Sequence, residues 1–162
     1  MSIEPEYVDS DVIEEDWNFY EVEDGTIIKA KLVLIKIVRE DIDNVGNPIY
    51  GLNTQKIFGV IPPKELMGPP SEGSYTPEEA VNLIVEEDLE FRVIKENWNE
   101  YKLKDGTKLN IKLVITTIAR TDLYDQRGEP IYGIQSQILV KAVVPRELRK
   151  KLQKYKKSIN SS

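Results

Sequence analysis

The sequence contains neither cysteine nor histidine. The absence of cysteine excludes disulfides and thiolate chemistry, and the absence of both residues excludes a zinc site of the Cys/His kind. Without histidine, no catalytic scheme can rest on an imidazole base. The lack of cysteine, together with many Glu, Lys and Ile residues, is compatible with a thermophilic source.

Long apolar runs are also missing. No segment approaches the roughly 20 apolar residues of a membrane-spanning helix. The N-terminal sequence MSIEPEYVDSD is acidic and has no apolar stretch, so it does not read as a secretory signal. With 40% hydrophobic and 31% charged residues, the composition is that of a folded, globular chain. We therefore expect a cytoplasmic location and no membrane partner.

Charge is unevenly distributed along the chain. The net charge is −6, yet residues 146–157 hold seven basic residues and one acid, which leaves −12 for the remainder. An acidic body repels nucleic acid over most of its surface, and only the basic segment attracts it. A helix over about 146–156 would place Leu148, Leu152 and Tyr155 on one stripe. This helix therefore either binds RNA or an acidic partner, or packs its stripe on its own acidic body, and the second reading is favoured.

The sequence repeats itself. Residues 12–66 contain WNFYEVEDGTIIKAKLVLIKIVRED and GNPIYG, and residues 93–148 contain WNEYKLKDGTKLNIKLVITTIARTD and GEPIYG. The offset is 81 residues from Trp17/Trp98 onward and 82 after the following loop. At 162 residues the chain has room for two such units. We expect a first repeat unit at 1–67, a linker with a short helix at 68–86, and a second unit at 87–162.

Each copy reads as an antiparallel β-meander. Asp-Gly pairs at 24–25 and 105–106 lie between alternating runs and predict hairpins with type I′ turns. The predicted strands are 18–23, 26–39 and 49–61 in the first copy and 99–104, 107–120 and 131–144 in the second. The long middle strand changes its apolar parity midway in both copies, which indicates a bulge or a strand buried on both faces.

Proline punctuates the rest of the chain. Pro63 and Pro145 each begin a predicted helical turn, where a missing N–H is harmless. Thr76 is the expected N-cap of a helix over about 77–86. The predicted fold is mainly β, with two tandem, pseudo-symmetric meander or small-barrel units, a short helix in the linker and a basic C-terminal helix.

Polar positions kept in both copies are the candidate binding residues. The basic ones lie on the polar parity of the long strand and the glutamines on that of the third strand, so both could line one surface per unit. The alternative is cross-strand pairing with Asp41, Asp122 and nearby acids, worth about 0.2–1 kcal/mol per pair. The candidates are Lys31, Lys112, Arg39, Arg120, Gln55 and Gln137.

Aromatic residues kept in both copies have two readings. Trp17/Trp98 and Tyr50/Tyr132 could stack on bases, as aromatic residues do in single-strand-binding barrels. Each begins an apolar run, however, and small units need large side chains to fill a core. Core packing is the favoured reading for both pairs, and Tyr50 and Tyr132 stay among the candidate binding residues.

No motif points to catalysis or to a cofactor. The loop Asp41-Ile-Asp43-Asn44-Val-Gly46 resembles a calcium loop but lacks the later bidentate Glu, so we interpret it as a hairpin loop and expect no metal. There is no phosphate-binding glycine loop and no G-x-S-x-G elbow. A carboxylate hydrolase, with or without Mg²⁺, would need a concave cluster of three or more acids.

The sequence therefore favours a non-catalytic cytosolic binding or scaffold protein without cofactors, whose units face a protein partner or each other. The alternative is a nucleic-acid-binding small-barrel protein that uses the basic residues kept in both copies and the basic C-terminal helix.

Overall fold

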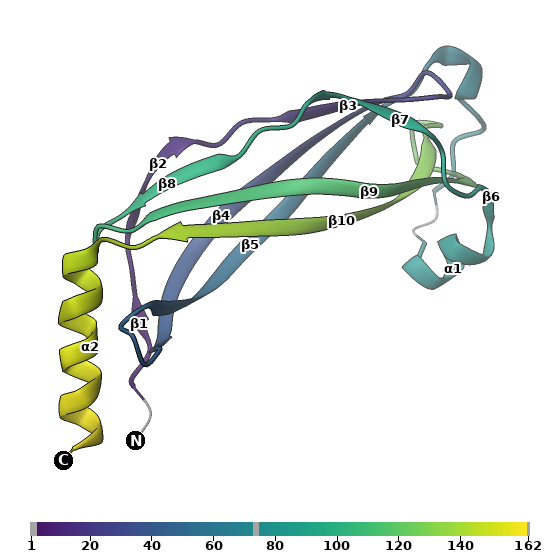
Figure 1. Cartoon of the computed structure of the whole chain (residues 1–162). Helices are drawn as coiled ribbons and strands as arrows, with labels where there is room; N and C mark the ends of the chain where they lie inside the picture. The colour runs from purple at the N-terminus through teal and green to yellow at the C-terminus, as the bar shows by residue number, and fades with distance from the viewer. Residues whose placement is uncertain (1–2, 73–74, 162) are drawn as a thin grey trace.

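The computed structural model describes residues 3–72 and 75–161. Within this part the chain is mainly β, with two antiparallel sheets that pack around a shared core (Figure 1). Gly73 and Ser74, which belong to the predicted linker, lie outside the described residues. None of the helices described is long and apolar enough to cross a membrane.

The first half of the chain supplies most of one sheet. Strands β3, β4 and β5 follow one another as an antiparallel meander, and β1 pairs with the far end of β4. A single 3₁₀ turn, η1 (Lys64–Leu66), follows Pro63 as the sequence predicts. The strands are β1 (Glu6–Tyr7), β2 (Ser10–Glu14), β3 (Asn18–Val22), β4 (Ile27–Ile42) and β5 (Pro48–Ile61).

The second half supplies most of the other sheet in the same way. Strands β8, β9 and β10 form a meander, and β6 pairs with the far end of β9. The elements are α1 (Pro77–Asn82), β6 (Ile84–Glu86), β7 (Phe91–Lys95), β8 (Asn99–Leu103), β9 (Lys108–Tyr124), β10 (Pro130–Val143) and α2 (Arg146–Asn160).

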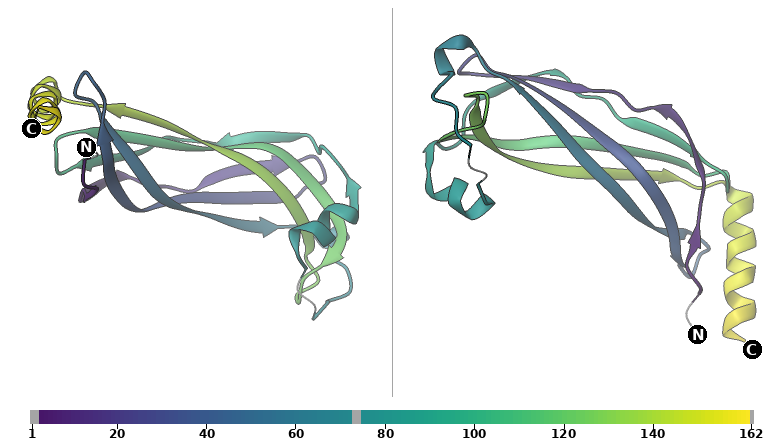
Figure 2. Two further views of the ribbon diagram at one scale, coloured as in Figure 1. Left: turned by 90° about the horizontal axis from the view of Figure 1, so that it is seen from below. Right: turned by 180° about the vertical axis from the view of Figure 1, so that it is seen from behind.

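Each sheet also contains one strand from the other half of the chain. Strand β2 pairs with β8, and strand β7 pairs with β3. The views in Figure 2 show the two sheets crossing along one elongated body, with α1 near one end and α2 at the other. The core accordingly mixes residues of both halves, such as Ile28 and Leu32 with Ile111 and Leu113. Neither sheet closes into a barrel in the described part of the chain.

The parity change in the long strands is produced by β-bulges. The register of β4 with β5 shifts between Leu34 and Lys36, so Ile35 is the extra residue. The register of β9 with β10 shifts at Thr116, which is the matching position of the second copy. Because side chains alternate along a strand, one extra residue moves the buried set to the other parity. The predicted bulge is confirmed in both strands.

The predicted hairpins form, but the predicted type I′ turn is wrong. Gly25 and Gly106 have φ values of 92° and 100°, while no described non-glycine residue has a positive φ. Val22 N–H donates to Thr26 O, and Gly25 N–H donates to Val22 O, which defines a three-residue loop. Asp24 has a negative φ, and its carboxylate accepts the Thr26 N–H at 3.0 Å. Only the glycine takes the left-handed conformation.

Three further expectations need correction. Helix α1 has the predicted Thr76 cap, which accepts the Glu79 N–H at 3.2 Å, but it ends at Asn82 because residues 84–86 pair with β9 instead. Val140 belongs to the apolar alternation of the predicted strand 131–144, which would place it in the core, but it is 55% exposed on β10. Trp17 and Trp98 are only partly buried, so core packing is wrong for them.

Candidate functional site

The centre of the molecule holds a buried polar network that joins the two halves. Asn18 donates to the Leu113 carbonyl at 3.3 Å, and Asn99 donates to the Leu32 carbonyl at 2.8 Å. Both asparagines are buried, each with 5% exposure. A buried amide is stable only when its hydrogen bonds are satisfied, so these two contacts fix how one sheet lies on the other.

Two tyrosines extend this network to acids of the opposite half. Tyr20 donates to Glu96 at 2.7 Å, and Tyr101 donates to Glu15 at 2.6 Å. Burial raises the pKa of both hydroxyls well above their usual range, and the neighbouring carboxylate adds to the shift. A hydroxyl that holds its proton this firmly acts as a hydrogen-bond donor at neutral pH, which suits a structural contact.

A second polar cluster, the Tyr132 cluster, consists of Tyr132, Asp24, Thr26 and Arg120. The Tyr132 hydroxyl lies 2.7 Å from both the Asp24 carboxylate and the Thr26 hydroxyl, and Arg120 donates to Asp24 at 2.9 Å. Burial alone would raise the pKa of Asp24, but the hydrogen bonds from Tyr132, Thr26 and Arg120 lower it below 3.8. Burial raises the pKa of Tyr132 to about 12. The cluster therefore carries an ionised Asp24 at neutral pH.

The residues that match these in the repeat form the Tyr50 cluster, which joins Tyr50 of the first copy to Asp105 and Thr107 of the second. Tyr50 donates to the Asp105 carboxylate and lies 2.9 Å from the Thr107 hydroxyl. Arg39, which faces Tyr50 across the strand pair, binds Glu6 at 2.6 Å, and its buried Nε has no hydrogen-bond partner among the residues that the structure describes. The two clusters therefore differ in one contact. Arg120 binds Asp24 within its own cluster, whereas Arg39 binds Glu6, which lies outside the Tyr50 cluster.

The Tyr50 cluster adjoins a cavity of about 580 Å³ beside α2. Arg39, Lys104 and Asp105 line it from the sheets, and α2 contributes Leu148 and Lys151. Arg120 lies elsewhere, in a pocket of about 200 Å³ with Met67 and Tyr124. The structure therefore brings Arg39 together with Tyr50 and Arg120 together with Tyr132, but it does not bring the two arginines to one surface.

The remaining candidates are dispersed. The Lys31 ammonium lies 5.8 Å from the centre of the Trp17 ring, and the Lys29 ammonium lies closer, at 4.1 Å. Lys112 lies 5.8 Å from the Trp98 ring and 3.5 Å from Glu96. Gln55 is exposed on β5 and Gln137 on β10, each of which lies at an edge of its sheet. Arg39, Arg120 and Lys112 pair with acids as the alternative reading predicted, although the partners are Glu6, Asp24, Glu86 and Glu96 rather than Asp41 or Asp122. Lys31 forms no such pair with the described residues and contacts Trp17 instead.

The basic helix α2 packs the two leucines of its predicted stripe on its own chain, whereas Tyr155 of the same stripe is 45% exposed. Leu152, with 5% exposure, joins Ile3 and Ile42 in a second small core, and Leu148 packs against it. Lys156 donates to the Ile42 carbonyl. The face of α2 opposite this apolar stripe is basic and open to solvent.

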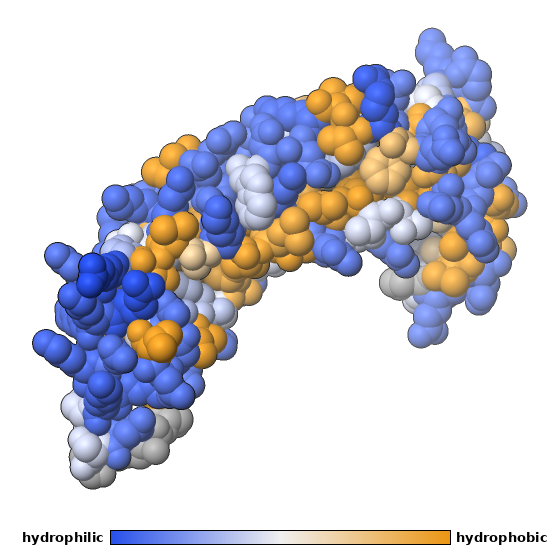
Figure 3. Space-filling view, in the orientation of Figure 1, coloured by the Kyte–Doolittle hydropathy of each residue, from blue (hydrophilic) through white to orange (hydrophobic). Residues whose placement is uncertain are grey.

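A groove of about 880 Å³ lies between α1 and the β9–β10 face, at the other end of the molecule. Apolar side chains of α1, β6, β9 and β10 line it, and Figure 3 shows apolar residues following the inner curve of the arched molecule toward this end. Three acids stand among the lining residues. The apolar set is Ala80, Val81, Ile84, Ala119, Ile131 and Ile134, and the acids are Glu87, Asp88 and Asp125.

Carboxylates do not gather into a metal site in the part of the chain that the structure covers. No group of three or more Asp or Glu residues there could hold a metal ion. Asp43, of the calcium-like loop, accepts the N–H groups of Val45 at 3.0 Å and Asn47 at 2.8 Å. The loop is therefore a hairpin closed by its own aspartate.

Sequence reasoning missed the residues of the central network. Asn18/Asn99, Tyr20/Tyr101 and Glu15/Glu96 are identical in both copies, so the repeat carried the signal. Tyr20 and Tyr101 read as members of an apolar alternation, and nothing local shows that each hydroxyl reaches an acid of the other half. The groove under α1 could not be anticipated, because it depends on how α1 folds back over β10.

The chain was compared with known protein families, curated proteins and solved structures. No protein-family model, no curated protein and no solved structure matches it. Its function must therefore be argued from its own geometry.

Proposed function

We propose that this chain is a non-catalytic, cytosolic binding or scaffold protein built from two pseudo-symmetric β units, and that it binds its partner in the groove under α1. The observation that carries the proposal is the groove itself, whose apolar walls are interrupted by Glu87, Asp88 and Asp125. Such a surface favours an apolar or amphipathic segment that carries positive charge.

The placement of the conserved pairs within the repeat supports a structural role for most of them. Tyr20, Tyr101, Asn18 and Asn99 are engaged in contacts between the halves. Pairs that match in the repeat make matching contacts, which supports the pseudo-symmetric reading. These side chains stabilise the contact between the two halves and are not free to bind a partner. The groove, which they do not line, is the surface that we propose for binding.

Binding of a basic amphipathic peptide tests this proposal. A fluorescent helical peptide with a leucine face and a lysine face should bind, as measured by anisotropy, whereas its leucine–glutamate counterpart should not. Val81→Gln, on the groove wall, should weaken binding about tenfold, because burying a valine contributes about 1.5 kcal/mol. Val85→Gln is the matched control, since Val85 is exposed but does not line the groove. Equal binding of both peptides, or equal effects of both variants, would refute the proposal.

Nucleic-acid binding is the second candidate, favoured by the basic face of α2. Arg39 and Arg120 give it no support, because both are bound to acids. Single-stranded RNA held by α2 should bind far more tightly at about 50 mM than at about 300 mM salt. If its affinity does not change between these salt concentrations, this candidate fails.

A further inference from the structure

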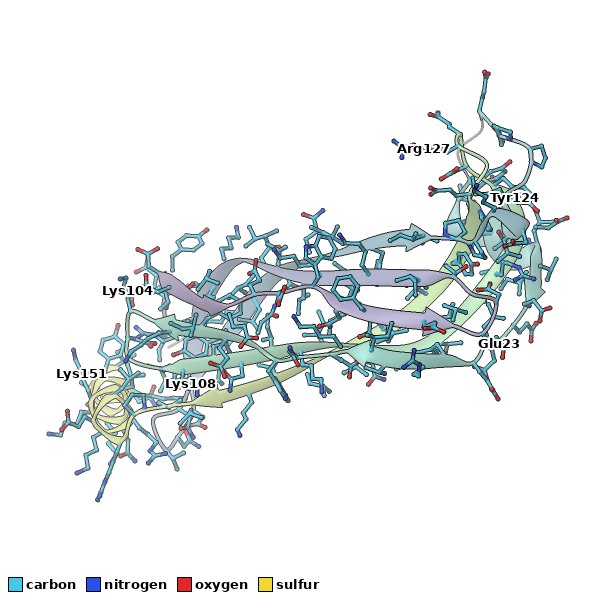
Figure 4. All side chains as sticks on the ribbon, turned by 90° about the horizontal axis from the view of Figure 1, so that it is seen from above. Glu23, Lys104, Lys108, Tyr124, Arg127 and Lys151 are labelled. Carbon is cyan, nitrogen blue, oxygen red and sulfur yellow. The ribbon has the colours of Figure 1, made fainter. Side chains whose placement is uncertain are left out.

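The two ends of the molecule carry opposite charge. Residues 78–90, which include most of α1 and all of β6, contain six acids and no base, while residues 146–157 carry a net charge of +6. Figure 4 shows Lys151 at the α2 end and Tyr124 and Arg127 at the opposite end. Arg127 is exposed and partly offsets the acids there. Charged segments of opposite sign therefore lie at the two ends, which we call the basic end (α2) and the acidic end (residues 78–90).

The basic end presents a rigid ridge of cations. Arg146, Lys150, Lys154 and Lys157 follow one another at intervals of four, four and three residues, which places them on one face of the helix. This face lies opposite the stripe of Leu148 and Leu152, and all four side chains are exposed. None of the four forms an ion pair with the described residues, whereas Lys156, on the flank, lies 4.0 Å from Asp41.

The acidic end offers a complementary surface. Glu87 and Asp88 are exposed, and with Asp125 they stand beside the apolar walls of the groove. Lysine can lay its methylene stem on an apolar wall while its ammonium group reaches a carboxylate. The groove therefore fits a ridge of lysines on a helix better than it fits a purely apolar segment.

We propose that this chain assembles head to tail, with the basic ridge of α2 of one copy seated in the acidic groove under α1 of the next. The proposal deepens the proposed function, on which it rests, by naming the partner as a second copy. Ridge and groove lie at opposite ends, so each contact leaves one of each free, and copies add to form open chains or rings. A second copy is favoured over nucleic acid because the acidic groove complements the ridge, whereas the −12 body repels a polyanion.

Sedimentation velocity of the full chain tests the assembly. At about 50 mM salt the mean mass should exceed that of the monomer and rise with protein concentration; at about 500 mM, where charges are screened within a few ångströms, it should return to the monomer. The double variant Lys150→Glu/Lys154→Glu and the double variant Glu87→Lys/Asp88→Lys should each be monomeric at low salt. All four positions are exposed, so circular dichroism should show an unchanged fold.

Mixing the two double variants provides the decisive control. The first variant keeps an intact groove and the second keeps an intact ridge, so an equimolar mixture should associate again. Glu14→Lys, a single exposed acid-to-lysine change on β2, should assemble like the unaltered chain. A mixture that stays monomeric, or a wild-type chain that is monomeric at every salt concentration, would overturn the proposal.

Two outcomes separate this inference from the function on which it rests. If the chain stays monomeric but binds the leucine–lysine peptide in the groove, the head-to-tail assembly fails and the binding function stands. If it stays monomeric and α2 binds single-stranded RNA, the ridge is a nucleic-acid site and the assembly is likewise overturned. If the chain stays monomeric and binds neither the peptide nor RNA, both proposals fail.

Discussion

At the scale of single residues, the buried tyrosine–glutamate contacts join the two halves most directly. Each hydroxyl donates to a carboxylate that belongs to the other half of the chain. A buried hydroxyl needs an acceptor, and the carboxylate of the other half supplies it.

Removing one of these hydroxyls should destabilise the fold. Tyr20→Phe or Tyr101→Phe should lower the free energy of unfolding by about 1.5–3 kcal/mol, because a hydrogen bond to a charged group is lost between the two halves. Urea unfolding measures this. Tyr7→Phe is the control, since Tyr7 is 72% exposed and should change stability by less than about 0.5 kcal/mol. Equal stabilities of the core and control variants would contradict this account.

Ionised Asp24 should make the stability of the fold decrease at acid pH. Its folded-state pKa is lowered, so its contribution is fully present above the ordinary value of 3.8 and is lost as the pH falls through the lowered pKa. Asp24→Asn should cost about 1–3 kcal/mol at pH 7 and flatten the loss of stability below about pH 4. Unfolding midpoints measured across this range test the expectation. Asp11→Asn, in an exposed pair with Lys104, should leave the profile unchanged.

At the scale of elements, glycines set where hairpins turn and how closely α2 approaches. Gly46 has a φ of 91°, and a Cβ there would overlap the carbonyl of Arg149 on α2. The Asp-x-x-Gly loop was readable from the sequence as a turn. Its contact with a helix about 100 residues later was not, because no local pattern records it.

Gly46→Ala should therefore loosen α2. The left-handed conformation alone costs an alanine about 1–2 kcal/mol, and the overlap with Arg149 adds to this. Hydrogen exchange of the α2 amides should accelerate more than that of the β9 amides. Gly133→Ala is the matched control, because a Cβ at Gly133 meets no atom within 4 Å and its φ is not in the left-handed range. The same exchange rates in both variants would show that the packing of α2 does not depend on Gly46.

At the scale of the whole molecule, the exchange of β2 and β7 makes each sheet depend on both halves. One core cluster spans them, with Ile28 of β4 and Leu109 of β9 both fully buried. A half that unfolded alone would strip a strand from the other sheet and expose shared core, so we expect a single cooperative transition.

Single-tryptophan variants can test this cooperativity. Trp17→Phe leaves Trp98 as the reporter, and Trp98→Phe leaves Trp17. In each variant, the denaturant midpoint of unfolding measured by tryptophan fluorescence should equal the midpoint measured by circular dichroism. If one reporter unfolds at a lower denaturant concentration than the dichroism signal, the halves are independent units instead.

The sequence by itself determined the local structure of this protein. Alternating residues and Asp-Gly pairs located the meanders, the shift in apolar parity located the bulges, and the prolines located the helix starts, because each depends on neighbours close in the chain. Only the tertiary structure decided that β2 and β7 change sheets, that each tyrosine finds an acid of the other half, and that a groove opens under α1. These features depend on contacts between residues far apart in the chain, such as each tyrosine and its acid, which lie 76 and 86 positions apart, and no local sequence pattern encodes them.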